Sequence, residues 1–145
     1  MADPLHQSGP LSSPLTVSVV TPEATVLETT ADFVVLPLYD GELGVAPGRS
    51  PLIGRLGYGE LRIRSGGIHK RYFVNGGFVQ VARNVVSVLT NSAVPAELLD
   101  VEAARSELAA ARLRPANSPE LLEIRDRQQL AARAKIRVAA KQRGH

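Results

Sequence analysis

Apolar and polar residues alternate along most of the chain between Leu15 and Thr90, in short segments separated by residues that favour turns. Leu15, Val17 and Val19 fall on one side of the first segment. A period of two is typical of half-buried β-strands. We therefore predict strands over residues 15–21, 24–28, 33–38, 52–56, 59–64, 69–74, 77–82 and 85–90. Eight to ten short strands with frequent turns indicate a β-sandwich or a barrel.

Turn-forming residues are concentrated between Asp40 and Arg64, where six glycines and two prolines interrupt the apolar positions. Glycine permits positive φ, and proline fixes φ and removes a backbone donor. We interpret this stretch as loops that hold strands in place. The dipeptides Asn75-Gly76 and Arg83-Asn84 are each predicted to form a two-residue hairpin turn.

The period changes after Asn91, from two to between three and four. Asp100 is a suitable cap for a helix that begins at Val101, and its predicted apolar stripe is Val101, Ala104, Leu108 and Ala111. Ser118 is a suitable cap for a second helix over residues 119–143. The predicted buried side of this second helix is Leu122, Leu130, Ala134 and Val138. Because so much of the contact is alanine, we expect the helix pair to undock easily.

These patterns divide the chain into a disordered lead-in over residues 1–14, a β-sandwich domain over 15–95 and a helical hairpin over 96–145. The lead-in combines Pro, Ser and Gly without periodicity. The expected fold class is thus an N-terminal flattened β-sandwich followed by a C-terminal antiparallel α-helical hairpin.

Positive charge is concentrated at the end of the chain. The net charge is only +3, but from Ile124 onward seven Lys and Arg residues face one acidic residue. Three interpretations remain open: a solvated helix face, contact with an acidic protein surface, or nucleic-acid binding. Nucleic acid is weakened as a partner because no aromatic residue follows Phe78 to stack on bases.

Residues that could carry chemistry are scattered. The three histidines, His6, His69 and His145, lie far apart, and the chain contains no cysteine. Metal sites need clustered ligands, and no nucleophile elbow or phosphate-binding loop is present. We expect no catalytic residues, no metal and no required cofactor. With no long apolar run and no signal peptide, we expect a protein that is soluble or held at a membrane only through partners.

Three blocks of sequence resemble one family. They are GELGVAPGRSPL followed by GELRI (residues 41–52 and 59–63), YFVNGGFVQV followed by NVVSVL (72–81 and 84–89), and the helical hairpin. In order and spacing they are similar to subunit epsilon of the bacterial F-type ATP synthase, over roughly residues 15–143. Arg49 departs from the family pattern, which more usually has His there.

The resemblance implies a non-catalytic rotor subunit that couples the catalytic head to the ion-translocating c-ring. It implies that the sandwich docks on the gamma subunit and that a loop near residues 42–51 points toward the c-ring. The interface residues carried over in this way are Glu42, Leu43, Gly44, Arg49 and Pro51. Alternatively, Glu42 has no partner protein and is simply a polar, solvent-exposed residue of a turn. Arg49 in place of His would make that contact permanently charged.

The resemblance also assigns regulation to the hairpin. In the family the hairpin can lie folded against the sandwich or extend toward the catalytic beta subunit, where basic side chains meet acidic ones and stop ATP hydrolysis. Some bacterial members bind a regulatory ATP through arginines on both helices. The corresponding candidates here are Glu102, Arg105, Arg112, Arg133 and Arg137, with Glu102 where the family has Asp and Ser106 where it has Ala.

We conclude that the resemblance implies a central-stalk subunit that is peripheral to the membrane, on the cytoplasmic face of the cell inner membrane, and attached through its partners. The competing interpretation is a free-standing β-sandwich module whose basic helical tail binds nucleic acid or an acidic protein.

Overall fold

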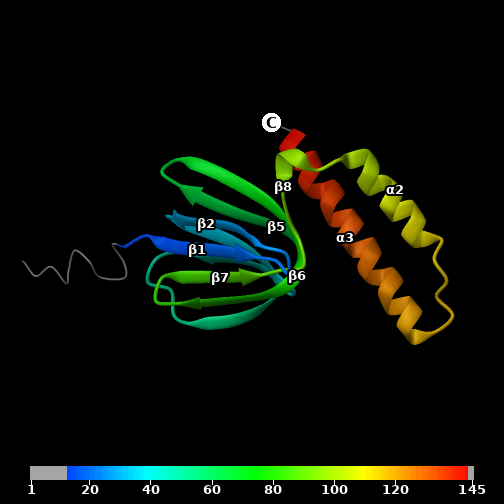
Figure 1. The fold of residues 1–145 in the computed structure, drawn as a ribbon, viewed down its shortest axis with the longest axis horizontal. Coiled ribbons are helices and arrows are strands. Elements are labelled where there is room, and N and C mark those ends of the chain that lie inside the picture. The colour runs from blue at the N-terminus through cyan, green and yellow to red at the C-terminus, as the bar shows by residue number, and fades with distance from the viewer. Residues whose placement is uncertain (1–12, 144–145) are drawn as a thin grey trace, which may run out of the picture. The chain divides into compact units, whose positions relative to one another are not determined.

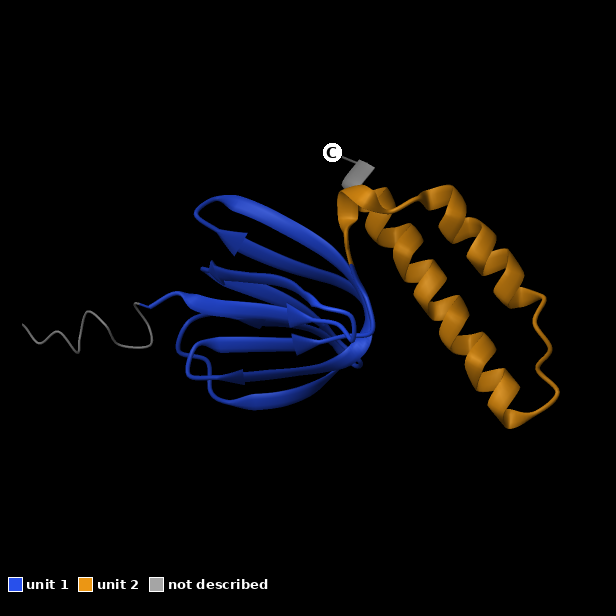
Figure 2. Ribbon diagram, viewed as in Figure 1, with its two compact units in different colours: residues 1–93 blue, residues 94–145 orange. Residues whose placement is uncertain are grey.

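The computed structural model describes residues 13–143, so most of the predicted lead-in lies outside the described residues. The chain divides into two compact units, of which the first ends at Ala93 and the second begins at Val94 (Figure 2). The first unit contains most of the β-structure and the second contains the helices.

The β-strands form one hydrogen-bonded path in the order β2-β1-β7-β6-β5-β3-β4, with β8 paired to β6 (Figure 1). Their bounds are β1 Leu15–Val20, β2 Thr25–Ala31, β3 Phe33–Leu38, β4 Gly41–Val45, β5 Leu52–Ser65, β6 Ile68–Ala82, β7 Val85–Leu89 and β8 Ala93–Pro95. Neighbours are antiparallel except β1 and β7, which are parallel.

The two longest strands, β5 and β6, pair along almost their whole length and curve strongly (Figure 1). Their two halves therefore belong to the two layers of a sandwich. Side chains from both ends of the hydrogen-bonded path meet in one core, where Val17 of β1 and Leu36 of β3 are fully buried. All buried members of this core lie between Leu15 and Val88.

This architecture confirms the predicted sandwich but corrects several of its details. Residues 52–56 and 59–64 were predicted as separate strands, and so were 69–74 and 77–82. They are continuous in β5 and β6, so the prediction of a turn at Asn75-Gly76 is wrong. The interpretation of residues 40–64 as loops that hold strands in place missed β4, and the two strands predicted within this stretch are one strand, β5. Residues 13–143 contain eight strands, which agrees with the expected number, but two of them are long.

The reason for the missed continuity lies at Gly76 and Gly77, which have φ of +68° and +112° inside β6. They bend the strand instead of reversing it. The backbone N–H of Asn75 next to them is satisfied from outside the β5–β6 ladder, by Thr90 Oγ1 at 3.1 Å and Ser92 O at 3.2 Å. Asn91 Nδ2 in turn donates to Asn75 O at 3.0 Å. The bend thus leaves none of these backbone groups without a partner.

The second unit contains a 3₁₀ turn, η1 (Ala96–Leu98), and two helices, α2 (Val101–Arg112) and α3 (Pro119–Arg143). Both predicted caps are confirmed: Asp100 Oδ1 accepts from Ala103 N at 3.1 Å, and Ser118 Oγ accepts from Leu121 N at 3.1 Å. Side-chain oxygens at these positions satisfy donors that the first helical turn leaves open.

The buried sides of the helices agree only in part with expectation. Val101, Ala104 and Ala111 of α2 are buried as predicted. In α3, Ala134 and Val138 are buried, but Leu122 and Leu130 are 40% and 52% exposed, so their predicted burial is wrong. Small side chains therefore provide most of the buried surface.

We expect Gly77→Ala to be far more destabilising than Gly67→Ala. A Cβ at Gly77 would lie 1.9 Å from Leu89 O, whereas a Cβ at Gly67, with φ of +84°, would meet no atom within 4 Å. The control should therefore cost only left-handed strain, about 1–2 kcal/mol, and Gly77→Ala at least about 3 kcal/mol. Urea unfolding of both variants measures the difference, and equal losses would contradict the close approach of β6 to β7.

Candidate partner-binding surfaces

Large apolar side chains are exposed together on the outer face of β5, β6 and β7. Ile53, Phe78 and Leu89 are 77%, 59% and 56% exposed, whereas their strand neighbours Val79 and Val88 are buried. The strand register places Phe78 directly beside Leu89. The alternation of the strands thus sends one set of apolar side chains into the core and leaves another set in water.

Tyr39 extends this group at the end of β3. Its backbone N–H donates to Arg55 O at 2.8 Å, and the Arg55 guanidinium lies 4.3 Å from the centre of its ring. Arg55 is itself opposite Phe78 in the β5–β6 register. We call Tyr39, Ile53, Phe78 and Leu89 the apolar strip. Contiguous exposed groups of this kind mark interaction sites more often than bare surface.

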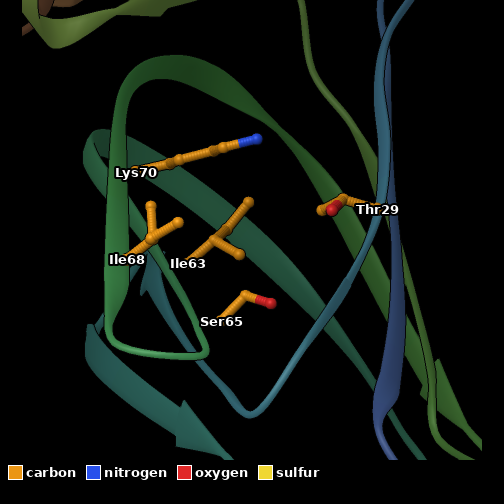
Figure 3. A pocket seen from close by; sticks show the side chains of 5 residues that line it. All are labelled: Thr29, Ile63, Ser65, Ile68 and Lys70. Atoms are coloured by element: carbon orange, nitrogen blue, oxygen red, sulfur yellow. The ribbon is translucent and has the colours of Figure 1, made fainter.

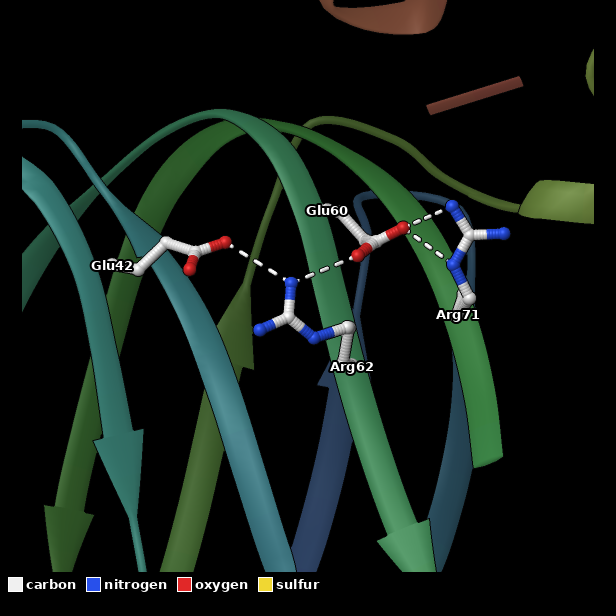
Figure 4. A network of polar contacts seen from close by, with 4 residues as sticks. All are labelled: Glu42, Glu60, Arg62 and Arg71. Atoms are coloured by element: carbon white, nitrogen blue, oxygen red, sulfur yellow. Dashed lines mark hydrogen bonds and ion pairs between the residues drawn. The ribbon is translucent and has the colours of Figure 1, made fainter. Parts of the chain in front are cut away.

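A chain of charged side chains connects β4, β5 and β6 (Figure 4). Arg62 Nη1 donates to Glu42 Oε2 at 3.1 Å and to Glu60 Oε1 at 3.0 Å. The second carboxylate oxygen of Glu60 pairs with Arg71. Glu60 is only 7% exposed, and a carboxylate so buried is stable when several charged donors surround it.

The pKa of Arg62 lies above the ordinary value for arginine. Partial burial of the guanidinium acts in the opposite direction, but hydrogen bonds to Glu60 and Glu42 and the attraction of both carboxylates outweigh it. Arg62 therefore stays charged at every physiological pH. This network is structural in its effect: it fixes the edge strand β4 to the centre of its layer.

The interface residues expected from the sequence fall into two groups. Glu42, Leu43 and Gly44 lie on β4 and pair with β3, so they belong to an edge strand instead of a loop. Arg49 and Pro51 lie in the connection from β4 to β5 and are exposed. The Glu42 carboxylate already forms an ion pair with Arg62, and the partly buried Leu43 packs against the core.

A small pocket opens between β2 and the β5–β6 hairpin (Figure 3). Thr29, Ile63, Ser65, Ile68 and Lys70 line it, and its volume is about 110 Å³. Ligand pockets usually measure about 300–1,000 Å³. This cavity is therefore too small for a nucleotide. In the described part of the chain, no three acidic or histidine side chains are grouped to hold a metal ion.

The arginines of α2 lie on one flank of its buried stripe. A helix turns by about 100° per residue, which places Arg105 and Arg112 together on one flank and Glu107 on the other. Glu107 Oε1 accepts from Lys135 Nζ at 2.9 Å and so marks the flank where α2 is joined to α3. Arg105 pairs with Glu102 at 3.2 Å, and both side chains are exposed.

The arginines of α3 lie away from the same ion pair. Arg133 and Arg137 are each two residues from Lys135, a rotation of about 200° in opposite senses, and are four residues apart on one side of α3. Since the helices run antiparallel (Figure 1), Arg137 is level with Arg105 when Lys135 is opposite Glu107. All four expected arginines are thus exposed, but Arg133 and Arg137 lie on the side of α3 opposite the residue that pairs with α2, and the structure does not bring them together with Arg105 and Arg112.

Comparison with known sequences shows the family to which this chain belongs. The profile of the family described as "ATP synthase, Delta/Epsilon chain, beta-sandwich domain" matches residues 14–96. The ATP synthase epsilon chain of Rhodopirellula baltica is 51% identical over 121 residues, which cover 83% of this chain and 94% of the relative. This chain belongs to the ATP synthase delta/epsilon family. The epsilon chain of Symbiobacterium thermophilum is 41% identical over 108 residues, or 71% of this chain and 78% of the relative.

Solved structures agree with the epsilon-type fold. A chain of the Euglena gracilis mitochondrial ATP synthase matches 94% of this chain and 85% of its own length, with a TM-score of 0.74 at 23% identity. A chain of the Tetrahymena thermophila central stalk and c-ring structure matches 88% and 97%, with a TM-score of 0.66 at 13% identity. At these identities the likeness concerns the fold.

The predicted family is therefore confirmed, and a free-standing nucleic-acid-binding module is not favoured. Within residues 13–143, no helix combines the length and the hydrophobicity needed to cross a membrane. Sequence reasoning did not find the apolar strip. Its signal was present, because Ile53, Phe78 and Leu89 occupy positions of their strands where the alternation calls for polar side chains.

Proposed function

We propose that this epsilon-type chain is a non-catalytic central-stalk subunit of a rotary ATP synthase, coupling the catalytic head to the c-ring. The observation that carries the proposal is the apolar strip. Four large side chains exposed on a rigid sheet face offer a partner several buried anchors of the kind that dominate binding energy.

The gamma subunit is the partner that we assign to the apolar strip. A shaft that transmits torque must not slip, so its contact needs packed apolar groups at the centre and polar groups at the rim. Arg55 and Gln80 lie opposite Phe78 and Ile53 and add polar groups to the same face. We assign the c-ring to the other expected interface, formed by Glu42, Leu43, Gly44, Arg49 and Pro51. The chain would then lie at the cytoplasmic face of the inner membrane through these partners.

Phe78→Glu should prevent stable assembly while leaving the fold intact, because Phe78 is exposed in the isolated chain. A charge buried against an apolar partner surface costs several kcal/mol, so we expect binding at least about 100-fold weaker. Val26→Glu, which adds the same charge to an exposed apolar residue of β2, is the matched control. Affinity purification of the synthase with each variant is the measurement. Equal recovery of gamma with both variants would contradict this docking surface.

The hairpin is proposed to restrain ATP hydrolysis through contact with the catalytic beta subunit. Its exposed basic residues suit an acidic surface, and it forms a unit separate from the sandwich. The core of the sandwich ends before this unit begins, so loss of the helices leaves it complete.

A chain that ends at Leu99 should assemble and should raise hydrolysis by the complex. Loss of an inhibitory contact worth about 1 kcal/mol releases activity roughly fivefold. The measurement compares ATPase rates of complexes with full-length and shortened chains at equal subunit content. An unchanged rate with normal assembly removes inhibition from the proposal.

We further propose that ATP binds the exposed arginines of the hairpin. Arg105, Arg112, Arg133 and Arg137 are exposed on its two helices, and guanidinium groups bind phosphates through paired hydrogen bonds. Glu102 pairs with Arg105 on the same helix. On binding of ATP, this ion pair would have to break, or Glu102 would have to contact the ligand together with Arg105.

Calorimetry with ATP should show binding to the full chain and loss of at least about tenfold in affinity for the double variant Arg105→Gln, Arg137→Gln. Arg114→Gln, which removes an exposed arginine from the loop beyond α2, should bind like the unaltered chain. No heat with millimolar ATP, or equal loss in the control, would exclude a specific site.

A further inference from the structure

The connection between β4 and β5 is held in one conformation by two hydrogen bonds. Arg49 N donates to Ala46 O at 3.2 Å, which closes a turn with Pro47 and Gly48 at its centre. Gly48 has φ of +87°, as the third residue of a type II turn requires. Gly48 N donates to Asn84 Oδ1 at 2.8 Å, across 36 residues of sequence.

Asn84 occupies a two-residue turn that is rigid in its own right. Arg83 and Asn84 have φ of +51° and +63° between the paired residues Ala82 and Val85. These angles are those of a type I′ hairpin turn, which asparagine tolerates better than most residues. The carbonyl of Asn84 also accepts from Thr16 N at 2.8 Å. One residue thus joins the β4–β5 connection, the β6–β7 turn and the start of β1.

Two arginines project from the turns that Asn84 joins. Arg49 follows Gly48 directly and Arg83 precedes Asn84, and both are exposed. No acidic residue occurs in residues 46–51 or 82–85. Guanidinium groups on fixed backbone lose less freedom on binding than groups on a mobile loop, and they match the geometry of carboxylates.

We propose that Asn84 is a positioning residue that presents Arg49 and Arg83 together to carboxylate groups on a protein partner in the synthase. The fixed turns favour a protein surface over lipid headgroups, because a fluid lipid surface gains nothing from a set spacing of charges. This inference rests on the proposed stalk function and adds Arg83 and Asn84 to the expected contact at Arg49.

Three variants of Asn84 separate positioning from folding. Asn84→Gly keeps the positive φ and the backbone carbonyl but removes the acceptor for Gly48 N. Asn84→Asp keeps an oxygen at the same place and should retain the hydrogen bond from Gly48 N. Asn84→Ala removes the acceptor and strains the turn. Hydrogen exchange at the Gly48 amide should accelerate about tenfold in Asn84→Gly and stay slow in Asn84→Asp.

Binding to the synthase lacking this subunit then tests the arginines. The double variant Arg49→Gln, Arg83→Gln should bind about tenfold more weakly and Asn84→Gly about threefold more weakly than the unaltered chain. Arg114→Gln is the control for loss of charge. In addition, Arg49→Lys and Arg83→Lys should form carbodiimide cross-links to a partner chain, since that reagent joins an amine to a carboxylate in contact.

The outcomes distinguish this inference from the stalk function itself. If the unaltered chain does not bind the synthase, the proposed function fails. If it binds and the Arg49, Arg83 and Asn84 variants bind equally well without cross-links, the carboxylate contact is overturned. Retention of the unaltered chain on phosphatidylglycerol vesicles, lost in the double arginine variant without any change in synthase binding, would assign the arginines to lipid and also overturn it.

Discussion

The fold depends on the close approach of the β6 backbone to β7 at Gly77. A Cβ there would fall 1.9 Å from Leu89 O, so only glycine permits the two strands to pair where β6 bends. The bend in turn lets β5 and β6 serve both layers, and this is what makes one hydrogen-bonded path enclose a core. Gly57 occupies the bend of β5, where a Cβ would lie 3.1 Å from Leu38 O. Small residues in both strands are thus a condition for closure, not a sign of loops.

Continuity across the two layers decides which surfaces remain for binding. Side chains of one set fill the core, and the curved strands place the alternate set outward on two different faces. One face carries the apolar strip and the other carries the Glu42–Arg62–Glu60–Arg71 network, which satisfies its own charges. A neutralised network gains little from a charged partner, because its hydrogen bonds are already made. We therefore assign apolar docking to the face that carries the apolar strip. Ion pairs with a partner protein are assigned to Arg49 and Arg83, whose turns contain no acidic residue.

The sequence predicted most of this fold, because strand periodicity and helix caps are local properties. The caps at Asp100 and Ser118 and the turn at Arg83-Asn84 depend on a few adjacent residues, and the structure confirms them. The failures all involve distant residues. Asn75-Gly76 has the composition of a hairpin turn, but Thr90 and Ser92 supply partners that keep β6 continuous. The bond from Gly48 to Asn84 and the ion pair from Glu42 to Arg62 could not be predicted either, since no local pattern records which turns or strands become neighbours.

The helical unit buries smaller side chains than the sandwich and is therefore held together less strongly. Fully burying a Val, Leu or Ile side chain stabilises a fold by about 1.5–3 kcal/mol, and alanine contributes much less. The sandwich core is made of such large side chains, whereas the buried positions of α2 and α3 are mostly alanine. The Glu107–Lys135 ion pair is partly exposed and adds at most about 1 kcal/mol. Separation of the helices would therefore cost little, as the proposed regulatory role of the hairpin requires. A sandwich with a core of large side chains and a helix pair joined mainly through alanine are thus built from the same chain by the choice of side-chain size.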